Sequence, residues 1–371
     1  MNTEWKKVKL KEVSDFTTGK LNSNAAVAGG EYPFFTCSPE TLQIDTYAFD
    51  QEALLLAGNN AEGNFSLKYY YGRFNAYQRT YVISSKDKNV LDLKFLYYSL
   101  RLCLKLFKDL SQGTATKFLT ASILNNFEIV LPPVDIQKSV TRILSAFDDK
   151  IELNTQINHN LEEQAKAILG QNCLAHKTLK VGDIVSFANG FAFKSSTYIE
   201  KGKFKVVTIK NVQDGKIDTS SADCVHEIPV KMKAECILNI GDVLLSLTGN
   251  VGRTGIVCEN NLLLNQRVAK IIPHQSVLNA VCYFIFRRPE MKAALETIAR
   301  GTAQANLSPV ETLDIEIPFD IPPLQGIALC MKSFFEQIIS NEMEIQKLAQ
   351  LRDALLPKLM SGEIDVSEVE V

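Results

Sequence analysis

Two long stretches of the chain carry apolar residues at alternating spacings of three and four positions, which is the pattern of an amphipathic helix. The first stretch lies within residues 135–176 and the second within 324–371. Each stripe holds for three heptads or more, which is typical of coiled-coil packing. Helices of about 30–38 residues are roughly 45–57 Å long at ~1.5 Å per residue, longer than most helices of globular proteins. The stripes consist of Leu144, Phe147, Ile151, Asn154, Ile157, Leu161, Ala165 and Ile168, and of Phe335, Ile338, Glu342, Ile345, Leu348, Arg352, Leu355 and Leu359.

Three polar residues interrupt these stripes, namely Asn154, Glu342 and Arg352. Polar residues on a helix seam cost stability, and they commonly fix the register and the partner. We therefore expect the two helices to pack on each other as an antiparallel coiled coil. In the alternative interpretation, each helix packs only on its own domain as a terminal helix.

The remaining pattern repeats itself along the chain, which is the first feature to seek in a new sequence. LKEVSDFTTG near the start matches VGDIVSFANG near the middle, and the segments 54–67 and 243–256 also correspond. GTATKFLT matches GTAQANLS, and each copy then reaches a Pro-Pro pair. The offset grows from 171 (Gly19 to Gly190) to 188 (Gln78 to Gln266), so the second copy holds about 17 extra residues, which we place within 191–242.

The repeat predicts two homologous globular domains, each followed by a long helix. The domains are expected at 1–134 and 177–323, the first helix at 135–176, and the second helix with a C-terminal tail at 324–371. Each domain mixes strand-like runs such as Val243–Leu247 with helix-like runs such as Leu93–Leu106, so the fold class is α+β.

The composition is that of an ordinary globular protein, with 46% hydrophobic and 22% charged residues. A net charge of −2 excludes a polybasic protein that coats nucleic acid by bulk charge. The globular segments carry a small basic excess and the helices an acidic one, so a polyanion is expected on the globular parts. No apolar run is long enough to span a membrane and no signal peptide is visible, so we expect a cytoplasmic protein. The eight cysteines form no C-x-x-C pair and are expected to be reduced, buried thiols.

Motifs for catalysis are missing from the sequence. The segment GNVGRTG (249–255) has neither P-loop nor dinucleotide spacing and is better explained as a glycine-rich hairpin. The four histidines are scattered, and Asp148 and Asp149 point about 100° apart on a helix. We therefore expect no catalytic residue, no metal site and no cofactor in this chain.

Polar turns with a basic residue are the candidate contacts to a polyanion such as a nucleic acid, because Arg, Asn and Gln read base edges and Lys and Arg bind phosphate. The candidates are Asn59, Asn60, Lys68, Arg73, Gln78, Arg79 and Lys117 in the first domain, and Lys194, Asn250, Arg253, Thr254, Gln266, Arg267 and Gln304 in the second. The Gln-Arg pair occurs in both copies, which favours a scaffold or phosphate role. Arg253 is expected at the exposed tip of a hairpin whose counterpart in the first domain has no arginine. A solvated turn is the alternative for that tip.

The ordered set of motifs resembles the DNA specificity subunit of type I restriction–modification systems. The matching segments are the opening Trp5-Lys6-x-Val8-x-Leu10-x-Glu12-Val13, GTATKFLT, GTAQANLS, LPPVDIQKSV, IPPLQGIA and the closing LRDALLPKLMSGEIDV. The resemblance extends over essentially the whole chain. It departs from the family pattern after the second Pro-Pro pair, where only Leu-Gln follows, whereas the first copy has Val-Asp-Ile-Gln.

The resemblance implies a non-catalytic subunit that binds bipartite double-stranded DNA, one half-site per domain, across a spacer set by the helices. It implies two modification subunits, which bind S-adenosylmethionine and methylate adenine, and restriction subunits that use ATP and Mg. Helix surface left after mutual packing is expected to dock these partners. Two alternatives stay open: a tandem-repeat coiled-coil scaffold that binds only protein, and a free-standing enzyme.

Overall fold

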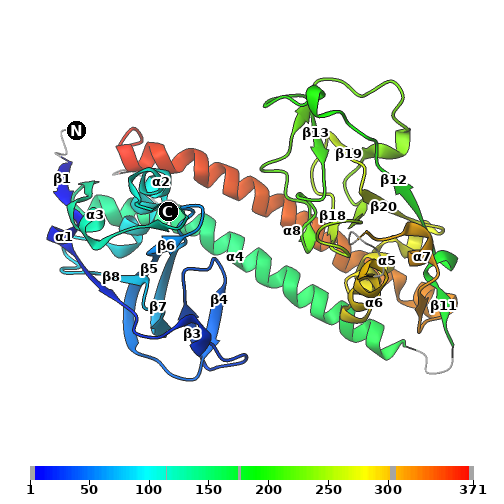
Figure 1. Ribbon diagram of the computed structural model, residues 1–371, viewed down its shortest axis with the longest axis horizontal. Coiled ribbons are helices and arrows are strands. Elements are labelled where there is room, and N and C mark those ends of the chain that lie inside the picture. Colours follow the sequence, from blue (N-terminus) through cyan, green and yellow to red (C-terminus); the bar gives the residue numbers. More distant parts are fainter. Residues whose placement is uncertain (1–4, 114, 174–176, 301–305, 367–371) are drawn as a thin grey trace. The chain divides into compact units, whose positions relative to one another are not determined.

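The structure is a computed structural model that describes residues 5–113, 115–173, 177–300 and 306–366 (Figure 1). The chain divides into two compact units: unit 1 contains residues 1–149 and 349–371, and unit 2 contains residues 150–348. Two long helices, α4 (Val134–Gln171) and α8 (Ile321–Ser361), each contribute one part to both units. Each unit therefore combines one globular domain with its own section of the helix pair.

The other elements of unit 1 alternate between short strands and helices. They are β1 (Lys6–Lys9), α1 (Leu10–Val13), β2 (Ser14–Thr18), η1 (Ser23–Ala25), β3 (Tyr32–Phe35), β4 (Thr41–Ile44), β5 (Phe49–Ala57), β6 (Asn59–Asn60), β7 (Leu67–Ala76), β8 (Thr80–Ser85), α2 (Leu93–Leu110), β9 (Lys117–Phe118), α3 (Ala121–Asn126) and β10 (Glu128–Leu131).

The core of unit 1 is a six-stranded sheet with the strand order β2-β8-β5-β7-β3-β4. Strand β5 is apolar throughout its second half because both faces of the sheet are covered there. Leu54 and Leu56 pack with Phe95 and Leu96 of α2 in the main core, whereas Leu55 belongs to a smaller aromatic cluster on the other face. The side chain of Asp92 caps α2 by accepting a hydrogen bond from the backbone N–H of Phe95 at 2.7 Å.

Unit 2 is built from more and shorter elements. They are β11 (Leu179–Lys180), η2 (Val181–Asp183), β12 (Val185–Asn189), η3 (Ser195–Thr197), β13 (Phe204–Val207), β14 (Gly215–Lys216), β15 (Cys224–Val225), η4 (Ala234–Cys236), β16 (Ile237–Leu238), β17 (Val243–Ser246), β18 (Thr254–Ile256), β19 (Leu262–Leu264), β20 (Val268–Pro273), η5 (Ser276–Leu278), α5 (Asn279–Phe286), α6 (Pro289–Arg300), α7 (Pro309–Leu313) and β21 (Glu316–Ile317).

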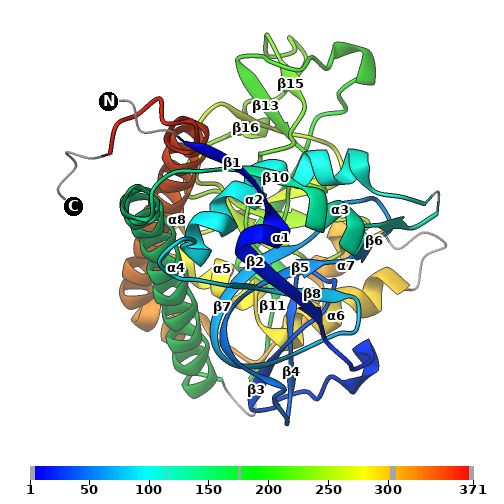
Figure 2. The ribbon, with the colours of Figure 1, turned by 90° about the vertical axis from the view of Figure 1, so that its left-hand side faces the viewer.

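The strand pairing of unit 2 follows that of unit 1. The order β12-β20-β17-β18 corresponds to β2-β8-β5-β7. The parallel pair of β13 with β19 corresponds to the parallel pair of β3 with the end of β7, so β13 matches β3 and β19 matches the end of β7. In both units the first strand of the domain pairs with the last, β1 with β10 and β11 with β21 (Figure 2 shows the first pair). The internal repeat predicted from the sequence is therefore confirmed, and the extra residues of the second copy lie around β14 and η4.

Helices α4 and α8 pack against each other in both units. In unit 1, Leu144 of α4 and Leu359 of α8 lie in the same core. In unit 2, Ala165 and Leu169 of α4 share a core with Phe335 and other residues of α8. The end of each helix thus packs on the domain that it does not follow in sequence. The alternative in which each helix packs only on its own domain is wrong.

The polar residues on the helix stripes form hydrogen bonds across the pair. In unit 2 the side-chain amide of Asn154 donates to Glu344 at 2.8 Å, and the amide of Asn158 donates to Glu342 at 3.0 Å. Asn341 donates to Asn158 at 2.7 Å, and both of these amides are buried. Residues that follow one another in α4 meet residues in reverse order in α8, so the helices are antiparallel. The bonds fix this register because a shift by one turn leaves buried amides without partners.

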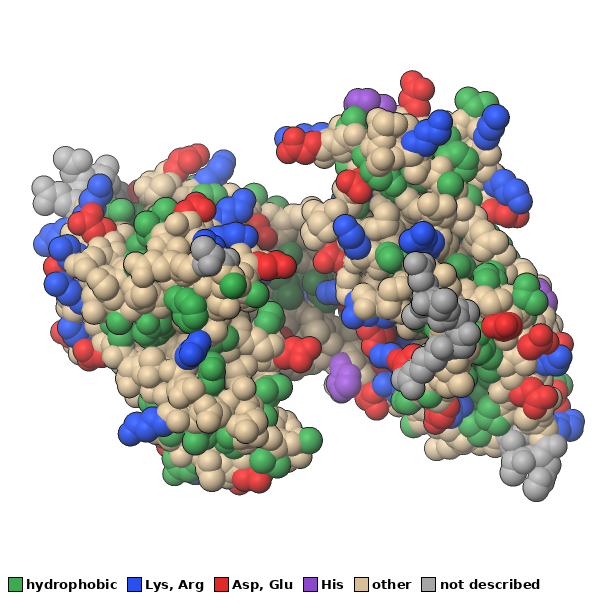
Figure 3. Space-filling view, viewed as in Figure 1, with side chains coloured by type: hydrophobic (Ala, Val, Ile, Leu, Met, Phe, Trp, Pro, Cys, Tyr) green, Lys and Arg blue, Asp and Glu red, His purple; other side chains and the backbone are tan. Residues whose placement is uncertain are grey.

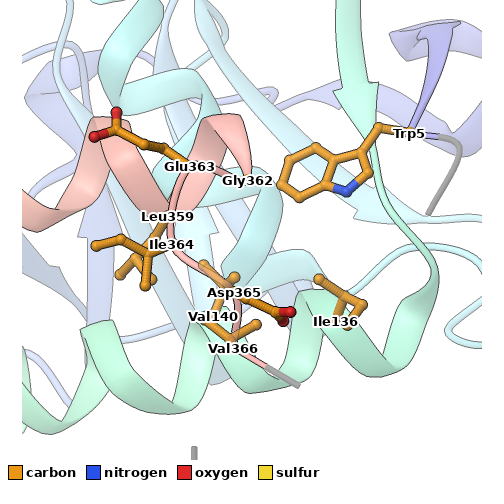
Figure 4. A pocket seen from close by; sticks show the side chains of 9 residues that line it. All are labelled: Trp5, Ile136, Val140, Leu359, Gly362, Glu363, Ile364, Asp365 and Val366. Carbon is orange, nitrogen blue, oxygen red and sulfur yellow. The ribbon is translucent and has the colours of Figure 1, made fainter. Parts of the chain in front are cut away.

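A recess of about 240 Å³ marks the place where the first residues of unit 1 meet the end of α8 (Figure 4). It is lined by Trp5 and, from the end of α8 and the residues that follow, by Leu359, Gly362 and Ile364. Gly362 has φ 74°, and a Cβ at this position would lie 2.9 Å from the indole ring of Trp5. Two segments that the sequence places at opposite ends of the chain therefore form one packed surface.

The cysteines differ in part from the sequence-based expectation. All eight are free thiols, and Cys224, Cys236, Cys258 and Cys282 are buried as predicted. Burial raises the pKa of Cys258 to about 12, so this thiol is inert at neutral pH. Cys330 is exposed, however, because it lies on the outer face of α8, away from the core that Met331 enters.

Candidate nucleic-acid interface

One edge of unit 1 gathers five of the residues predicted to contact DNA. We call Asn59, Asn60, Gln78, Arg79 and Lys117 edge 1. Strand β6 pairs with β9, which sets Asn60 opposite Lys117. The backbone N–H of Gly58 donates to the carbonyl of Arg79 at 2.8 Å, which brings the β7–β8 turn beside β6. These residues come from three segments that are far apart in the sequence, so only the sheet assembles them.

The side chains of edge 1 are already held by neighbours. The Arg79 guanidinium lies 5.5 Å from the ring centroid of Phe118, and both residues are exposed. The Gln78 amide donates to Asn22 at 2.9 Å. The side-chain oxygen of Asn60 accepts from the backbone N–H groups of Glu62 and Asn64, so it is used to shape the turn. Arg79 and Gln78 thus offer the most accessible contact groups of this edge.

Two other candidates of unit 1 lie elsewhere on the sheet. Lys68 donates to Thr41 at 3.0 Å and is partly desolvated, which lowers its pKa. Arg73 forms an exposed ion pair with Asp50 at 3.1 Å. Neither residue is joined to edge 1 by a contact in the described part of the chain.

The corresponding edge of unit 2 has the same backbone frame. We call Asn250, Arg253, Gln266 and Arg267 edge 2. Leu247 donates its N–H to the carbonyl of Arg267 at 2.9 Å, as Gly58 does to Arg79. The Gln N–H groups of the two turns also bond equivalent carbonyls, those of Leu21 and Phe191. Gly190 permits this close approach, because a Cβ there would lie 2.0 Å from the carbonyl oxygen of Asn265.

The side chains of edge 2 differ from those of edge 1. Arg253 donates to Gln213 at 2.8 Å and is half-buried, so the prediction that it lies at the exposed tip of the hairpin is wrong. The tip itself is Asn250, which is exposed. Arg253 and Asn250 line a recess of about 350 Å³ together with Lys292 of α6. Arg267 is exposed and has φ 71°, a conformation that non-glycine residues seldom adopt.

Three remaining candidates of the second domain have different outcomes. Thr254 is only 1% exposed, and its hydroxyl bonds the carbonyl of Gly252, so it cannot contact DNA in this conformation. It does not lie in a polar turn, as expected of the candidates, because it begins strand β18, whose residues are all buried. Lys194 is exposed in the loop before η3. Gln304 lies outside the described residues.

Sequence reasoning missed four residues at these edges: Asn22, Phe118, Gln213 and Lys292. Gln213 lies 40 positions from Arg253. It also belongs to the insertion that the first domain lacks, so the repeat gave no signal for it. For Phe118 the sequence does carry a signal, because this residue follows Lys117 in the GTATKFLT motif.

Charges on the surface of each unit are mixed. On the face drawn in Figure 3, acidic and basic side chains are interspersed over both units. The basic excess of the domains therefore forms no large positive field on this face. Contact to a polyanion there has to come from particular side chains rather than from bulk charge.

The family model described as the type I restriction modification DNA specificity domain matches residues 2–163 and again residues 176–350. Each match covers one globular domain together with most of the long helix that follows it. The chain belongs to this family.

Several relatives support this membership. The EcoDI specificity subunit of Escherichia coli is 39% identical over 149 residues, which are 40% of this chain and 32% of that protein. The MjaVIII specificity subunit of Methanocaldococcus jannaschii is 25% identical over 345 residues, 85% of this chain and 79% of that protein. The chain thus matches less than a third of the first relative but most of the second.

A solved structure has the same fold. The S subunit of a type I restriction–modification system from M. genitalium is 18% identical and superposes with a TM-score of 0.61 over 96% of both chains. At this identity the likeness concerns the fold. It confirms the predicted fold class of two α+β domains with long helices.

Two further observations concern the described residues as a whole. They contain no group of three or more His, Cys, Asp or Glu side chains arranged to hold a metal ion. None of their helices combines the length and apolar character that crossing a bilayer demands.

Proposed function

We propose that this chain recognises a bipartite double-stranded DNA site, with edge 1 and edge 2 each reading one half. The observation that carries this proposal is the common frame of the two edges with different side chains. Edge 1 and edge 2 each place an exposed Gln-Arg turn beside the end of a central strand. The neighbouring residues differ, because Asn59 and Lys117 flank the turn of edge 1, whereas Asn250 and Arg253 flank the turn of edge 2. The shared frame suits phosphate contacts that set position, and the variable side chains suit base contacts that specify sequence.

In this proposal the helix pair sets the spacer between the half-sites and docks the modification subunits. Two half-sites must be read in one register, so the distance between the readers has to be fixed. Several apolar side chains of the pair face solvent, among them Leu153, Met343 and Leu351, each more than 40% exposed. Leu153 and Met343 lie at the same height along the two helices, because their sequence neighbours Asn154 and Glu344 form a hydrogen bond between α4 and α8. An exposed apolar surface of this kind fits a protein partner.

The proposal extends to the complex. The chain contributes no catalytic residue and holds no cofactor, while two modification subunits bind S-adenosylmethionine and methylate adenine in the half-sites. Restriction subunits with ATP and Mg complete the assembly in the cytoplasm.

The function is tested by mapping methylated adenines by single-molecule sequencing in cells with and without this gene. We expect methylation at one bipartite motif only when the gene is present. The purified complex should then bind a duplex with this motif with an affinity that falls as salt is raised, because counterions are released. A chain that restores no motif and binds no DNA would support the protein-only scaffold instead.

Replacing Arg253 by alanine tests the role of edge 2. If Arg253 contacts a base, the change should cost about 1–3 kcal/mol of binding free energy and relax one position of a single half-site. If it contacts phosphate, binding should weaken alike for all sequences and the salt slope should fall by about one.

The matched control is Gln213→Ala, which frees Arg253 from its partner and leaves its charge in place. A binding free energy for Arg253→Ala within ~0.5 kcal/mol of wild type would assign Arg253 to solvent.

A further inference from the structure

A buried tyrosine ties the globular domain to the helix pair in unit 1. Tyr98 of α2 is 2% exposed, and its hydroxyl donates to the carboxylate of Asp148 on α4 at 2.6 Å. Burial and this bond raise the pKa of Tyr98, so the phenol is always a donor. The other oxygen of Asp148 accepts from Arg352 of α8 at 2.5 Å. One phenol, one carboxylate and one guanidinium thus join α2, α4 and α8.

Unit 2 contains the same chemistry on different residues. Tyr283 of α5 is fully buried, and its hydroxyl donates to Glu162 of α4 at 2.9 Å. The second oxygen of Glu162 pairs with Arg287 at 2.6 Å. Arg287 also pairs with Asp214 at 2.6 Å, and its guanidinium lies 5.4 Å from the centroid of the Tyr283 ring. Here the arginine comes from the domain, whereas in unit 1 it comes from α8.

These contacts go beyond what burial of a tyrosine requires. A buried phenol needs one acceptor, and a backbone carbonyl satisfies it without burying a charge. In both domains the shortest bond of the phenol goes to a carboxylate on α4, although the Tyr283 hydroxyl also has the carbonyl of Gly215 within 3.5 Å. The carboxylate then needs an arginine to offset its desolvation. Apolar packing is non-directional, but a short hydrogen bond to a charged group holds a rotation angle. The two tyrosines therefore lie where the orientation of each domain on its helices is determined.

We propose that Tyr98 and Tyr283 are positioning residues that lock each domain in one orientation on the helices of its unit and thereby set the spacer length that the complex accepts. This inference rests on the proposed function. Loss of either hydroxyl lets one domain rock against the helices while its core and its edge stay intact. The half-sites are then still read, but spacers that are one base pair too long or too short are tolerated.

The test uses the full chain purified with the modification subunits of its host, in four forms: wild type, Tyr98→Phe, Tyr283→Phe and Tyr97→Phe. Tyr97 is the matched control, because it neighbours Tyr98 on α2 and its hydroxyl makes no hydrogen bond within the described residues. Binding is measured by fluorescence anisotropy on duplexes with the mapped spacer and with spacers one base pair shorter and longer.

Wild type and Tyr97→Phe are expected to share one preference for the natural spacer. In Tyr98→Phe and Tyr283→Phe the preference should fall about tenfold, the size expected for one lost hydrogen bond to a charged group, with both half-sites unchanged. Glu162→Gln, which keeps the side-chain volume but removes the charge, should act like Tyr283→Phe.

Unchanged spacer preference in both tyrosine variants would overturn the proposal, as would a uniform loss of affinity for all three spacers accompanied by a lower Tm. Failure of the proposed function is a separate result, because the wild-type complex itself would then show no bipartite target.

Discussion

A four-residue insertion after Leu153 in α4 alone is expected to abolish binding to the bipartite site. The insertion advances α4 by about 6 Å relative to α8 at the helical rise. Asn154 and Asn158 then lose Glu344, Glu342 and Asn341, and each buried polar group left unpaired costs about 1–3 kcal/mol. The measurement is anisotropy on the mapped target, with thermal unfolding of the same samples.

A second insertion of four residues after Glu344 in α8 provides the matched partner variant. It restores the register of the buried bonds, because Asn154 and Asn158 pair with Glu344 and residues before it, whereas Asp148 pairs with Arg352 on the other side of both insertions. The exposed ion pair between Lys150 and Glu344 is lost, but such a pair contributes little to stability. The doubly extended chain should bind again, and methylation mapping should return the same half-sites with a spacer about two base pairs longer at ~3.4 Å each. Changed half-sites with an unaltered spacer would contradict the assignment of the spacer to the helices.

Exchanging the second domain for that of a relative is expected to change one half-site completely and leave the other intact. The sequence suggests 177–323 as the segment to exchange. This boundary cuts through the core of unit 2, because Leu324 and Phe335 of α8 and Leu169 of α4 share a core with the domain. Such a chimera packs the core residues of the new domain against helix residues of the original chain that do not fit them. We therefore expect the chimera to be destabilised by several kcal/mol.

Exchange of the whole of unit 2, residues 150–348, avoids this problem. The bonds of Asn154 and Asn158 to α8 then stay within the donor, and the pair Asp148–Arg352 stays within the recipient. Methylation mapping should return one new and one original half-site. If both half-sites change together, the two edges do not read DNA independently.

The long helices and the repeat were predictable because both are local properties of the sequence. The stripe from Leu144 to Ala165 follows from the period of one helix. The strands found at Thr80–Ser85 and Val243–Ser246 follow from short runs rich in apolar residues. The match of Gly19 with Gly190 needs only comparison of the chain with itself. The fold class and the family resemblance rested on these features.

The candidate interface was predicted less well, because exposure depends on the neighbours of a residue in space. Thr254 and Arg253 are neighbours in the same glycine-rich segment. Thr254 begins a buried strand, whereas Arg253 is held by a hydrogen bond to Gln213. Gln213 has no counterpart in the first domain, so its role could not be inferred by comparing the two copies.

The sequence by itself determined that the protein has two copies of one α+β domain and two long helices, since periodicity and repetition are encoded along the chain. Only the tertiary structure decided that the end of each helix packs on the other copy's domain and that Tyr98 and Tyr283 direct their hydroxyls to carboxylates on α4. The physical reason is the separation in sequence: Asp148 lies 50 positions from Tyr98 and 204 from Arg352. No local pattern selects such partners, because a hydrogen bond or an ion pair requires only that the folded chain bring the two groups within reach.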